Sequence, residues 1–272
     1  MAAQAPPHRA ARGRHRPHGH GRRRAVLAGA WAHWRYRRAG ASGRGARRLG
    51  PGWRNRGNLA VSRVGILGGS FDPPHAGHLM IAREAKERVG LDGVLFIPAG
   101  EQWLKEGQDV APAMDRLAMT HLLIGSTADF AVSDMEITRP GPTYTVDTLR
   151  ELRETSPPNT EYYFIQGEDS VADLPRWHNP QELVTLCSFI AMPRVDGAGR
   201  PDLTAAYDAI PGLREKVTVL EDAPRMDVSS SSIRDMLETG ADLRVVVPDA
   251  VVKYIAAHRL YGRSGQTTPP AS

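Results

Sequence analysis

Short apolar runs alternate with helical patterns from Val61 onward. The runs predict six strands, at Val64–Leu67, Val94–Pro98, Phe130–Ser133, Tyr162–Gln166, Phe189–Met192 and Val217–Leu220. The run at 94–97 is apolar at every position, which is typical of a strand buried on both faces. Strands that alternate with helices predict an α/β fold with a mostly parallel sheet and helices on both faces.

Apolar residues recur at helical spacing between the predicted strands. Two such sets have spacings of three and four residues, namely Leu79, Ala82, Ala85 and Val89, and Leu117, Thr120, His121 and Ile124. We expect one domain at residues 61–261, followed by a frayed tail at 262–272. Ligands of open α/β sheets bind beyond the carboxyl ends of the strands, so the segments that follow the strands are the first candidates for a site.

The first sixty residues differ sharply in charge from the rest. The chain carries a net charge of +5, but residues 1–60 hold 15 of its 35 basic residues and no acidic one. The composition predicts a disordered Arg-rich extension. It could bind nucleic acid through phosphates or act as a transit peptide. We favour a third reading, that residues 1–60 are translated upstream DNA and that the native protein starts at Val61.

The single cysteine and the apolar runs bear on location. Cys187 has no partner for an internal disulfide, which fits a reducing compartment and a buried thiol. No uninterrupted apolar stretch approaches the roughly 20 residues that a membrane-spanning helix needs. We therefore expect a soluble, cytoplasmic protein without a membrane partner.

The segment Gly68–His78 follows the first predicted strand and leads into a helical pattern. Two glycines allow a sharp turn and a close backbone approach to a ligand, and the amides of Ser70 and Phe71 could then point into a crevice. His75 and His78 lie three residues apart across a helix start near Gly77, so both rings can face one side. No neighbouring residue completes a zinc site. Paired histidines there favour hydrogen bonds to phosphate over a core or capping role.

A run of serines near the C-terminus forms a second candidate phosphate site. Residues 228–234 read Val-Ser-Ser-Ser-Ser-Ile-Arg. Hydroxyl groups at a helix start accept from free amides and bind phosphate, and Arg234 adds a planar cation. The run alone would be equally compatible with simple helix capping.

The two segments together resemble the signatures of the nucleotidyltransferase superfamily, whose first element is H-x-G-H. Class I aminoacyl-tRNA synthetases share that element, but they are much larger and carry a lysine pair that is missing here. Residues 141–149, 163–170 and 174–177 (Gly-Pro-Thr-Tyr-Thr-Val-Asp-Thr-Leu, Tyr-Phe-Ile-Gln-Gly-Glu-Asp-Ser and Leu-Pro-Arg-Trp) resemble bacterial nicotinate-nucleotide adenylyltransferases. The resemblance covers about Val64 to Tyr261.

This resemblance implies a fold and a reaction. The fold would be a single Rossmann-like nucleotidyltransferase domain. The reaction would transfer the adenylyl group of ATP to nicotinate mononucleotide, giving deamido-NAD and pyrophosphate in NAD biosynthesis. Mg²⁺ would accompany ATP without a protein metal site, no specific nucleic acid would bind, and an oligomer is possible.

The resemblance also implies roles for individual residues. The catalytic residues would be His75, His78 and Arg234. The ATP site would add to these Gly68, Gly69, Ser70, Phe71, Gly167, Asp169, Ser230, Ser231 and Ile233. The nicotinate mononucleotide site would comprise Lys105, Thr143, Tyr144, Thr145 and Trp177, with Trp177 stacked on the pyridine ring.

Two segments depart from the family pattern. The family's Pro-His-Lys triplet after the second strand appears here as Trp103, Leu104 and Lys105, so a lysine contact with phosphate survives but a histidine role does not. Glu168 stands where a small residue is usual, and the sequence offers no reason for it.

Two other functions compete with this interpretation. A pantetheine-phosphate adenylyltransferase would share the first signature but should lack the 143–149 element and Trp177. A nucleic-acid-binding protein could use the arginine-rich extension, although the remaining chain, with 20 basic and 30 acidic residues, argues against it.

Overall fold

The computed structural model describes residues 62–100, 110–193, 200–224 and 227–262. The extension predicted at 1–60, nearly all of the tail predicted at 262–272, Lys105 and the start proposed at Val61 lie outside these residues. The boundaries predicted for the three parts of the chain remain predictions.

The described residues form a six-stranded sheet in which every neighbouring pair is parallel. The strands are β1 (Ser62–Gly69), β2 (Gly93–Pro98), β3 (Phe130–Val132), β4 (Thr160–Gly167), β5 (Ser188–Met192) and β6 (Val217–Val219). Their order is β3-β2-β1-β4-β5-β6. All six predicted strands are present, with ends that differ by at most two residues, so the predicted α/β fold is confirmed.

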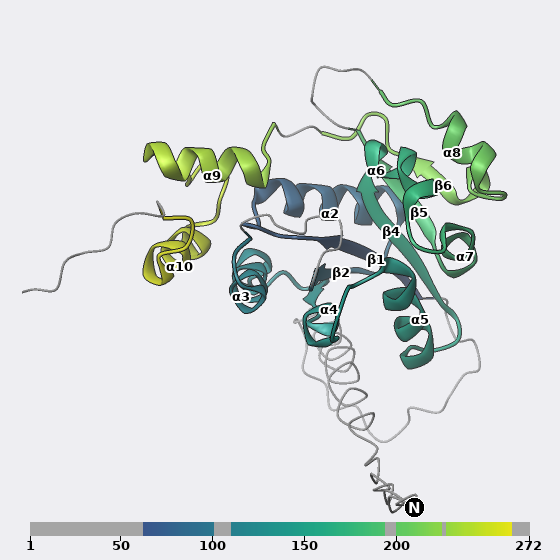
Figure 1. The fold of residues 1–272 in the computed structure, drawn as a ribbon, viewed down its shortest axis with the longest axis horizontal. Helices are drawn as coiled ribbons and strands as arrows, with labels where there is room; N and C mark the ends of the chain where they lie inside the picture. Colours follow the sequence, from purple (N-terminus) through teal and green to yellow (C-terminus); the bar gives the residue numbers. More distant parts are fainter. Residues whose placement is uncertain (1–61, 101–109, 194–199, 225–226, 263–272) are drawn as a thin grey trace, which may run out of the picture.

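Helices connect the strands and cover both faces of the sheet (Figure 1). The α-helices are α2 (Ala76–Val89), α3 (Ala113–Ile124), α4 (Met135–Thr138), α5 (Thr145–Thr155), α6 (Glu168–Ala172), α7 (Pro180–Leu186), α8 (Thr204–Ala209), α9 (Ser230–Thr239) and α10 (Asp249–His258). Two 3₁₀ turns, η2 (Leu174–Arg176) and η3 (Arg214–Lys216), precede α7 and β6. Figure 1 shows α9 and α10 on one side near α2 and α3, with α5, α7 and α8 on the other.

The strand pleat divides the core into two clusters, one on each face. In β1, Ile66 packs with the helices α5 and α7, whereas its neighbour Leu67 packs with α2, α3, α9 and α10. Both side chains are buried because each face of a parallel sheet is covered by helices. This burial explains why the strands read as continuous apolar runs.

The strand order reverses beside β1. The chain moves outward from β1 through β2 to β3 and then returns to place β4 on the other side of β1. The crevice of a doubly wound sheet opens at this switch point, beyond the carboxyl ends of the strands. Those ends are Gly69 in β1 and Gly167 in β4, so two of the predicted site segments begin there.

The predicted turn at the two glycines is wrong. Gly68 and Gly69 continue β1 and pair with Ile97 and Pro98 of β2. Neither has a positive φ, and the left-handed backbone occurs instead at Phe71, with φ of 52°. Gly68 lies close to the Phe164 ring, since a Cβ there would be 3.2 Å from the ring, and a larger residue would require that ring to shift.

Candidate active site

The loop after β1 is fixed by its own buried side chains. Phe71 is 1% exposed and packs against Phe96 and His78, with ring centroids 5.9 and 4.8 Å apart. Asp72 is also buried, and its Oδ1 accepts from the Tyr261 hydroxyl at 2.7 Å and from the Ala111 amide at 3.1 Å. Phe71 therefore shapes the loop from the core, and any contact with a nucleotide would come from its backbone.

The two histidines meet at the start of α2. Their ring centroids lie 3.9 Å apart, and the backbone N–H of His75 donates to Nδ1 of His78 at 3.2 Å. A Cβ on Gly77 would lie 2.9 Å from Nδ1 of His75, so only glycine leaves room for this ring. The glycine of the H-x-G-H element is thus required for the packing of His75 beside His78.

Both imidazoles are neutral near neutral pH. Burial lowers the pKa of His75 to about 4. Burial and the neighbouring charge of His75 lower the pKa of His78 well below its usual value. Because Nδ1 of His78 accepts a hydrogen bond, its proton resides on Nε2, which remains a donor. The Nδ1 atom of His75 is buried and has no hydrogen-bond partner.

The serines at the start of α9 have separate tasks. Ser229 and Ser232 form a reciprocal cap, with the Ser232 amide donating to Ser229 Oγ at 3.0 Å. Ser230 donates to the carbonyl oxygen of Pro73 at 2.9 Å. Ser231 Oγ accepts from Arg234 at 3.2 Å. The amides of Ser230 and Ser231 precede the first backbone hydrogen bond of α9, a position that suits them to bind an anion.

Arg234 joins the two predicted phosphate segments. Its Nη1 donates to the carbonyl oxygen of Asp72 at 2.7 Å and lies 3.5 Å from the Asp72 carboxylate. The Arg234 side chain is 32% exposed, whereas that of Asp72 is 4% exposed. One edge of the guanidinium is thus anchored to the β1 loop, and the other stays accessible.

Three residues that the sequence did not single out support this loop. Asp72 accepts from the tyrosine and the arginine just described, and Arg116 donates to the carbonyl oxygen of Ser70 at 2.7 Å. Burial and the adjacent Asp72 carboxylate raise the pKa of Tyr261, which therefore stays a donor. Asp72 lies inside the recognised segment and could have been suspected, but nothing local marks Arg116 or Tyr261.

Ile233 has a different place from the one predicted. Its side chain is fully buried in the core, and its amide donates to the carbonyl oxygen of Ser229 at 3.0 Å. Both groups are therefore occupied within the protein. Ile233 anchors α9 under the serines, and the structure does not support direct contact with ATP.

The end of β4 carries the Gly167–Asp169 element. A Cβ on Gly167 would lie 2.3 Å from Asp169 Oδ1, so the carboxylate folds over the glycine. Between them, Glu168 is 1% exposed and accepts from Arg200 at 2.6 and 3.0 Å. Arg200 also reaches Glu221 at 2.9 Å. The unexplained Glu168 is thus a buried ion-pair partner that ties the chain after β5 to this rim.

Among the described residues predicted for the second substrate, Tyr144 and Trp177 pack on the opposite face of the sheet from α9. The Tyr144 ring stacks on His178 with centroids 4.3 Å apart, which places the start of α5 beside the segment that carries Trp177. Trp177 meets the Phe164 ring edge-on at 5.9 Å and is only partly buried. The structure therefore brings Thr143–Thr145 and Trp177 together.

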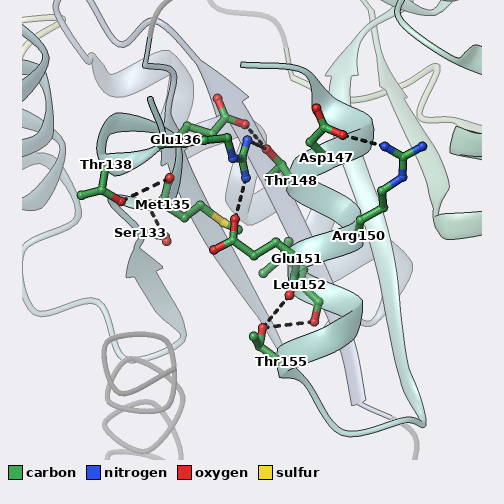
Figure 2. A network of polar contacts seen from close by, with 11 residues as sticks. Ser133, Met135, Glu136, Thr138, Asp147, Thr148, Arg150, Glu151, Leu152 and Thr155 are labelled. Atoms are coloured by element: carbon green, nitrogen blue, oxygen red, sulfur yellow. Dashed lines mark hydrogen bonds and ion pairs between the residues drawn. The ribbon is translucent and has the colours of Figure 1, made fainter. Parts of the chain in front are cut away.

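A cluster of polar side chains lies behind the start of α5 (Figure 2). The Thr148 hydroxyl donates to Glu136 Oε1 at 2.7 Å, and Arg139 donates to Thr148 at 3.0 Å and to Glu151 at 2.8 Å. Burial raises the pKa of Glu136, and hydrogen bonds from Thr148, the charge of Arg139 and a bond from Thr143 oppose that shift. Thr148 lies in the 141–149 element recognised in the sequence, but nothing in the sequence marked Glu136, Arg139 or Glu151 as its partners.

Metal and membrane features can be assessed only within the described ranges. There, no group of three or more His, Cys, Asp or Glu side chains is arranged to hold a metal ion. None of the helices in that part of the chain combines the length and apolar character needed to cross a membrane.

The chain is similar in sequence to known proteins. A family model described as cytidylyltransferase-like matches residues 66–236. A "probable nicotinate-nucleotide adenylyltransferase" of Dehalococcoides mccartyi is 47% identical over 201 residues, which covers 74% of this chain and 98% of that protein. Relatives with the same name from a Roseiflexus species and Corynebacterium kroppenstedtii are 46% and 42% identical and cover 75% of this chain, with 100% and 93% of their own lengths matched.

Solved structures agree on the fold. A Plasmodium falciparum nicotinic acid mononucleotide adenylyltransferase complexed with NaAD superposes with a TM-score of 0.60 at 21% identity. The same protein complexed with APC gives 0.58 at 21% identity. Each match covers 74% of this chain and 97% of the other. At this identity the likeness supports a shared architecture.

Proposed function

Because the chain belongs to the cytidylyltransferase-like family, and within it to the nicotinate-nucleotide adenylyltransferases, we propose that it transfers the adenylyl group of ATP to nicotinate mononucleotide in the crevice beside His75 and His78. The chain is a nucleotidyltransferase, and the products of its reaction are deamido-NAD and pyrophosphate. The observation that carries the site is the junction of the two phosphate segments, where Arg234 and Ser230 bond to Asp72 and Pro73.

The reaction needs little covalent chemistry from the protein. An oxygen of the acceptor's 5′-phosphate attacks the α-phosphorus of ATP, and the bond from that phosphorus to the β-phosphate oxygen breaks. A phosphate monoester is largely ionised at neutral pH, so no side chain has to remove a proton. Catalysis then rests on alignment and on stabilising the charge that develops.

The histidines act as neutral donors. The Nε2–H of His78 suits a hydrogen bond to an α-phosphate oxygen, because its Nδ1 is already held by the His75 backbone. His75 supplies a second donor to the phosphates. Because their pKa values are lowered, neither ring takes up a proton near neutral pH, and neither acts as a proton shuttle.

The start of α9 receives the leaving group. The first amides of the helix, the hydroxyl of Ser231 and the accessible edge of Arg234 bind the β- and γ-phosphates. Residues Gly68, Gly69 and Ser70 border the phosphates with their backbones. Gly167 and Asp169 border the ribose and adenine.

The acceptor occupies the neighbouring face. The amides of Thr143, Tyr144 and Thr145 and the hydroxyls of Tyr144 and Thr145 bind the nicotinate carboxylate, and Trp177 stacks on the pyridine ring. Lys105 contacts the acceptor phosphate as a point charge. Because Lys105 lies outside the described residues, this last assignment rests on the family resemblance alone.

Nucleotidyltransferases of this kind generally use a divalent metal with ATP, and we propose Mg²⁺. The donor set of the described residues fits a metal carried by the nucleotide, since Asp72, the carboxylate nearest Arg234, is already engaged by Tyr261 and Arg234. When bound, Mg²⁺ neutralises charge on the departing pyrophosphate. We further propose a cytoplasmic location, where ATP is made and where the buried free thiol of Cys187 stays reduced.

A parallel assay tests the proposed function. The purified chain is incubated with ATP labelled at the α-phosphate and with nicotinate mononucleotide, its amide, phosphopantetheine or no acceptor. We expect label in a dinucleotide with nicotinate mononucleotide and little transfer without acceptor. Preferred transfer to phosphopantetheine would contradict the proposal.

A further inference from the structure

Glu136 stands at the centre of the polar cluster behind the start of α5. Its Oε1 accepts from Thr148 at 2.7 Å, and its side chain also bonds to Thr143. Figure 2 shows Glu136 reaching from α4 toward Thr148 on the first turns of α5. Thr143 is 9% exposed and Thr148 is 1% exposed, so both hydroxyls sit away from bulk water.

This position is a costly one for a carboxylate. Burial raises the pKa of Glu136, which means that the site opposes its charge. Glu136 is itself partly exposed, and a carboxylate held partly away from water is weak evidence for stability, because an apolar side chain of similar size often stabilises a fold as well or better. We therefore expect a role of the Glu136 carboxylate besides folding, and its bonds to the hydroxyls of Thr143 and Thr148 indicate that it positions the start of α5.

Gly100, which follows β2, packs closely against Glu136 and Thr143. A Cβ on Gly100 would lie 2.3 Å from the carbonyl oxygen of Glu136 and 3.1 Å from the Thr143 methyl group. Thr143 is thus held from one side by the carboxylate and from another by a glycine that no other residue can replace. Two independent contacts fix the turn that leads into α5.

We propose that Glu136 is a positioning residue for the acceptor, which holds the Thr143 hydroxyl and so orients the first amides of α5 toward the acceptor's carboxylate. This inference rests on the proposed function, in which Thr143–Thr145 bind nicotinate mononucleotide. Glu136 touches neither substrate and acts through Thr143. The nucleotide end, on the other face of the sheet, does not depend on it.

The neighbouring ion pair offers a matched control. Glu151 bonds to Arg139, the arginine of the same cluster, at 2.8 Å, from a position on α5 that lies eight residues beyond Thr143 in the chain. Removing the Glu151 carboxylate disturbs the charge balance of the cluster and leaves the Glu136–Thr143 bond in place. A merely structural cluster would respond alike to changes at Glu136 and at Glu151.

The test measures both Michaelis constants and kcat in Glu136→Ala, Glu136→Gln and Glu151→Gln. We expect Glu136→Ala to raise KM for nicotinate mononucleotide about 10-fold, as fits the loss of a charge-assisted hydrogen bond, while KM for ATP changes less than about 2-fold. Glu136→Gln keeps an acceptor oxygen and restores most of the loss. Glu151→Gln should leave both constants near those of the native chain.

Equal rises in both Michaelis constants, or no rise in either, would overturn the inference. So would an equal response to Glu151→Gln. If Glu136→Ala does not fold, Thr143→Val, which keeps the methyl group and removes the hydroxyl, should raise the acceptor KM. Glu136→Leu, which removes the carboxylate and keeps much of the side-chain volume, should raise the acceptor KM in the native chain and have no further effect when added to Thr143→Val. Independent, additive effects in that pair would refute the link.

Failure of the inference can be told from failure of the proposed function. A native chain that does not adenylate nicotinate mononucleotide contradicts the proposed function. A native chain that does so, with an acceptor KM insensitive to Glu136 and Thr143, contradicts only the inference.

Discussion

The two ends of the crevice are held in different ways. At the nucleotide end, parts of the chain more than 150 residues apart meet, since Ser230, Arg234 and Tyr261 all bond to the loop at Asp72 and Pro73. At the acceptor end, the polar partners lie about one helix length apart in sequence, as in the 12-residue separation of Glu136 and Thr148. The aromatic contacts of Tyr144 and Trp177 complete that end.

This difference indicates that the nucleotide end and the acceptor end of the site are stabilised separately. The nucleotide end needs the whole fold to be assembled, because both faces of its phosphate cradle come from distant segments. The acceptor end joins segments that lie closer in sequence, between Gly100 and His178, and its contacts do not involve the cradle, so it can be altered without disturbing the cradle. Variants at the two ends should therefore affect different kinetic constants.

The largest effect is expected for His78→Ala. Removing one donor to the developing charge should lower kcat by about 100-fold or more while folding is nearly unaffected. Steady-state kinetics and thermal unfolding of the purified variant check both parts. His121→Ala, at an exposed position of α3, is the matched control and should retain native kcat. Full activity of His78→Ala would refute the donor role.

Arg234→Ala should have the next largest effect. It removes a charged donor from the leaving phosphates and frees the Asp72 loop, so kcat/KM for ATP should fall roughly 10- to 100-fold. Arg244→Ala is the control, since Arg244 is 71% exposed and pairs only loosely with Asp249 at 3.9 Å. Equal losses in the two variants would show that Arg234 contributes only surface charge.

Trp177→Ala tests the acceptor end. Loss of ring stacking should raise KM for nicotinate mononucleotide about 10-fold, with KM for ATP unchanged, and Trp177→Phe should recover much of the loss. Initial rates over a grid of both substrate concentrations measure this. A rise confined to the ATP constant would place the tryptophan at the wrong end.

The smallest effect concerns acid stability at the nucleotide end. The folded state holds the pKa of His75 at about 4, below its usual value of 6.5, so the unfolded chain binds the extra proton between these values. The contribution of His75 to the free energy of unfolding is therefore fully present above pH 6.5 and is lost as the pH falls toward 4. Between pH 7 and pH 5.5 the loss is about 1 kcal/mol. Urea unfolding at several pH values should show this slope, and His75→Gln should flatten it. An unchanged slope in that variant would assign the loss to other groups.

Local patterns predicted the fold and most of the candidate site. Continuous apolar runs marked the six strands because both sheet faces are buried, and the spacing of His75, Gly77 and His78 marked the start of α2. The two glycines before them were misread as a turn. They continue β1, and the close approach of Gly68 to Phe164 depends on a strand that lies nearly a hundred residues away.

The sequence did not predict which residues of distant segments form hydrogen bonds and ion pairs with one another. Nothing near Glu168 indicates that Arg200 will neutralise it, and nothing near Asp72 indicates Tyr261. Ile233 shows the same point in reverse, because a residue inside a recognised motif turned out to be fully buried. Burial and long-range hydrogen bonds arise only when the sheet brings the segments together.

Direct binding to the two ends tests the central claim, that one crevice has two separable halves. Calorimetry would measure a non-hydrolysable ATP analogue and nicotinate mononucleotide against the native chain, Arg234→Ala and Trp177→Ala. We expect Arg234→Ala to weaken only the ATP analogue and Trp177→Ala to weaken only nicotinate mononucleotide. Crossed effects, or equal weakening of both ligands by either variant, would contradict the account.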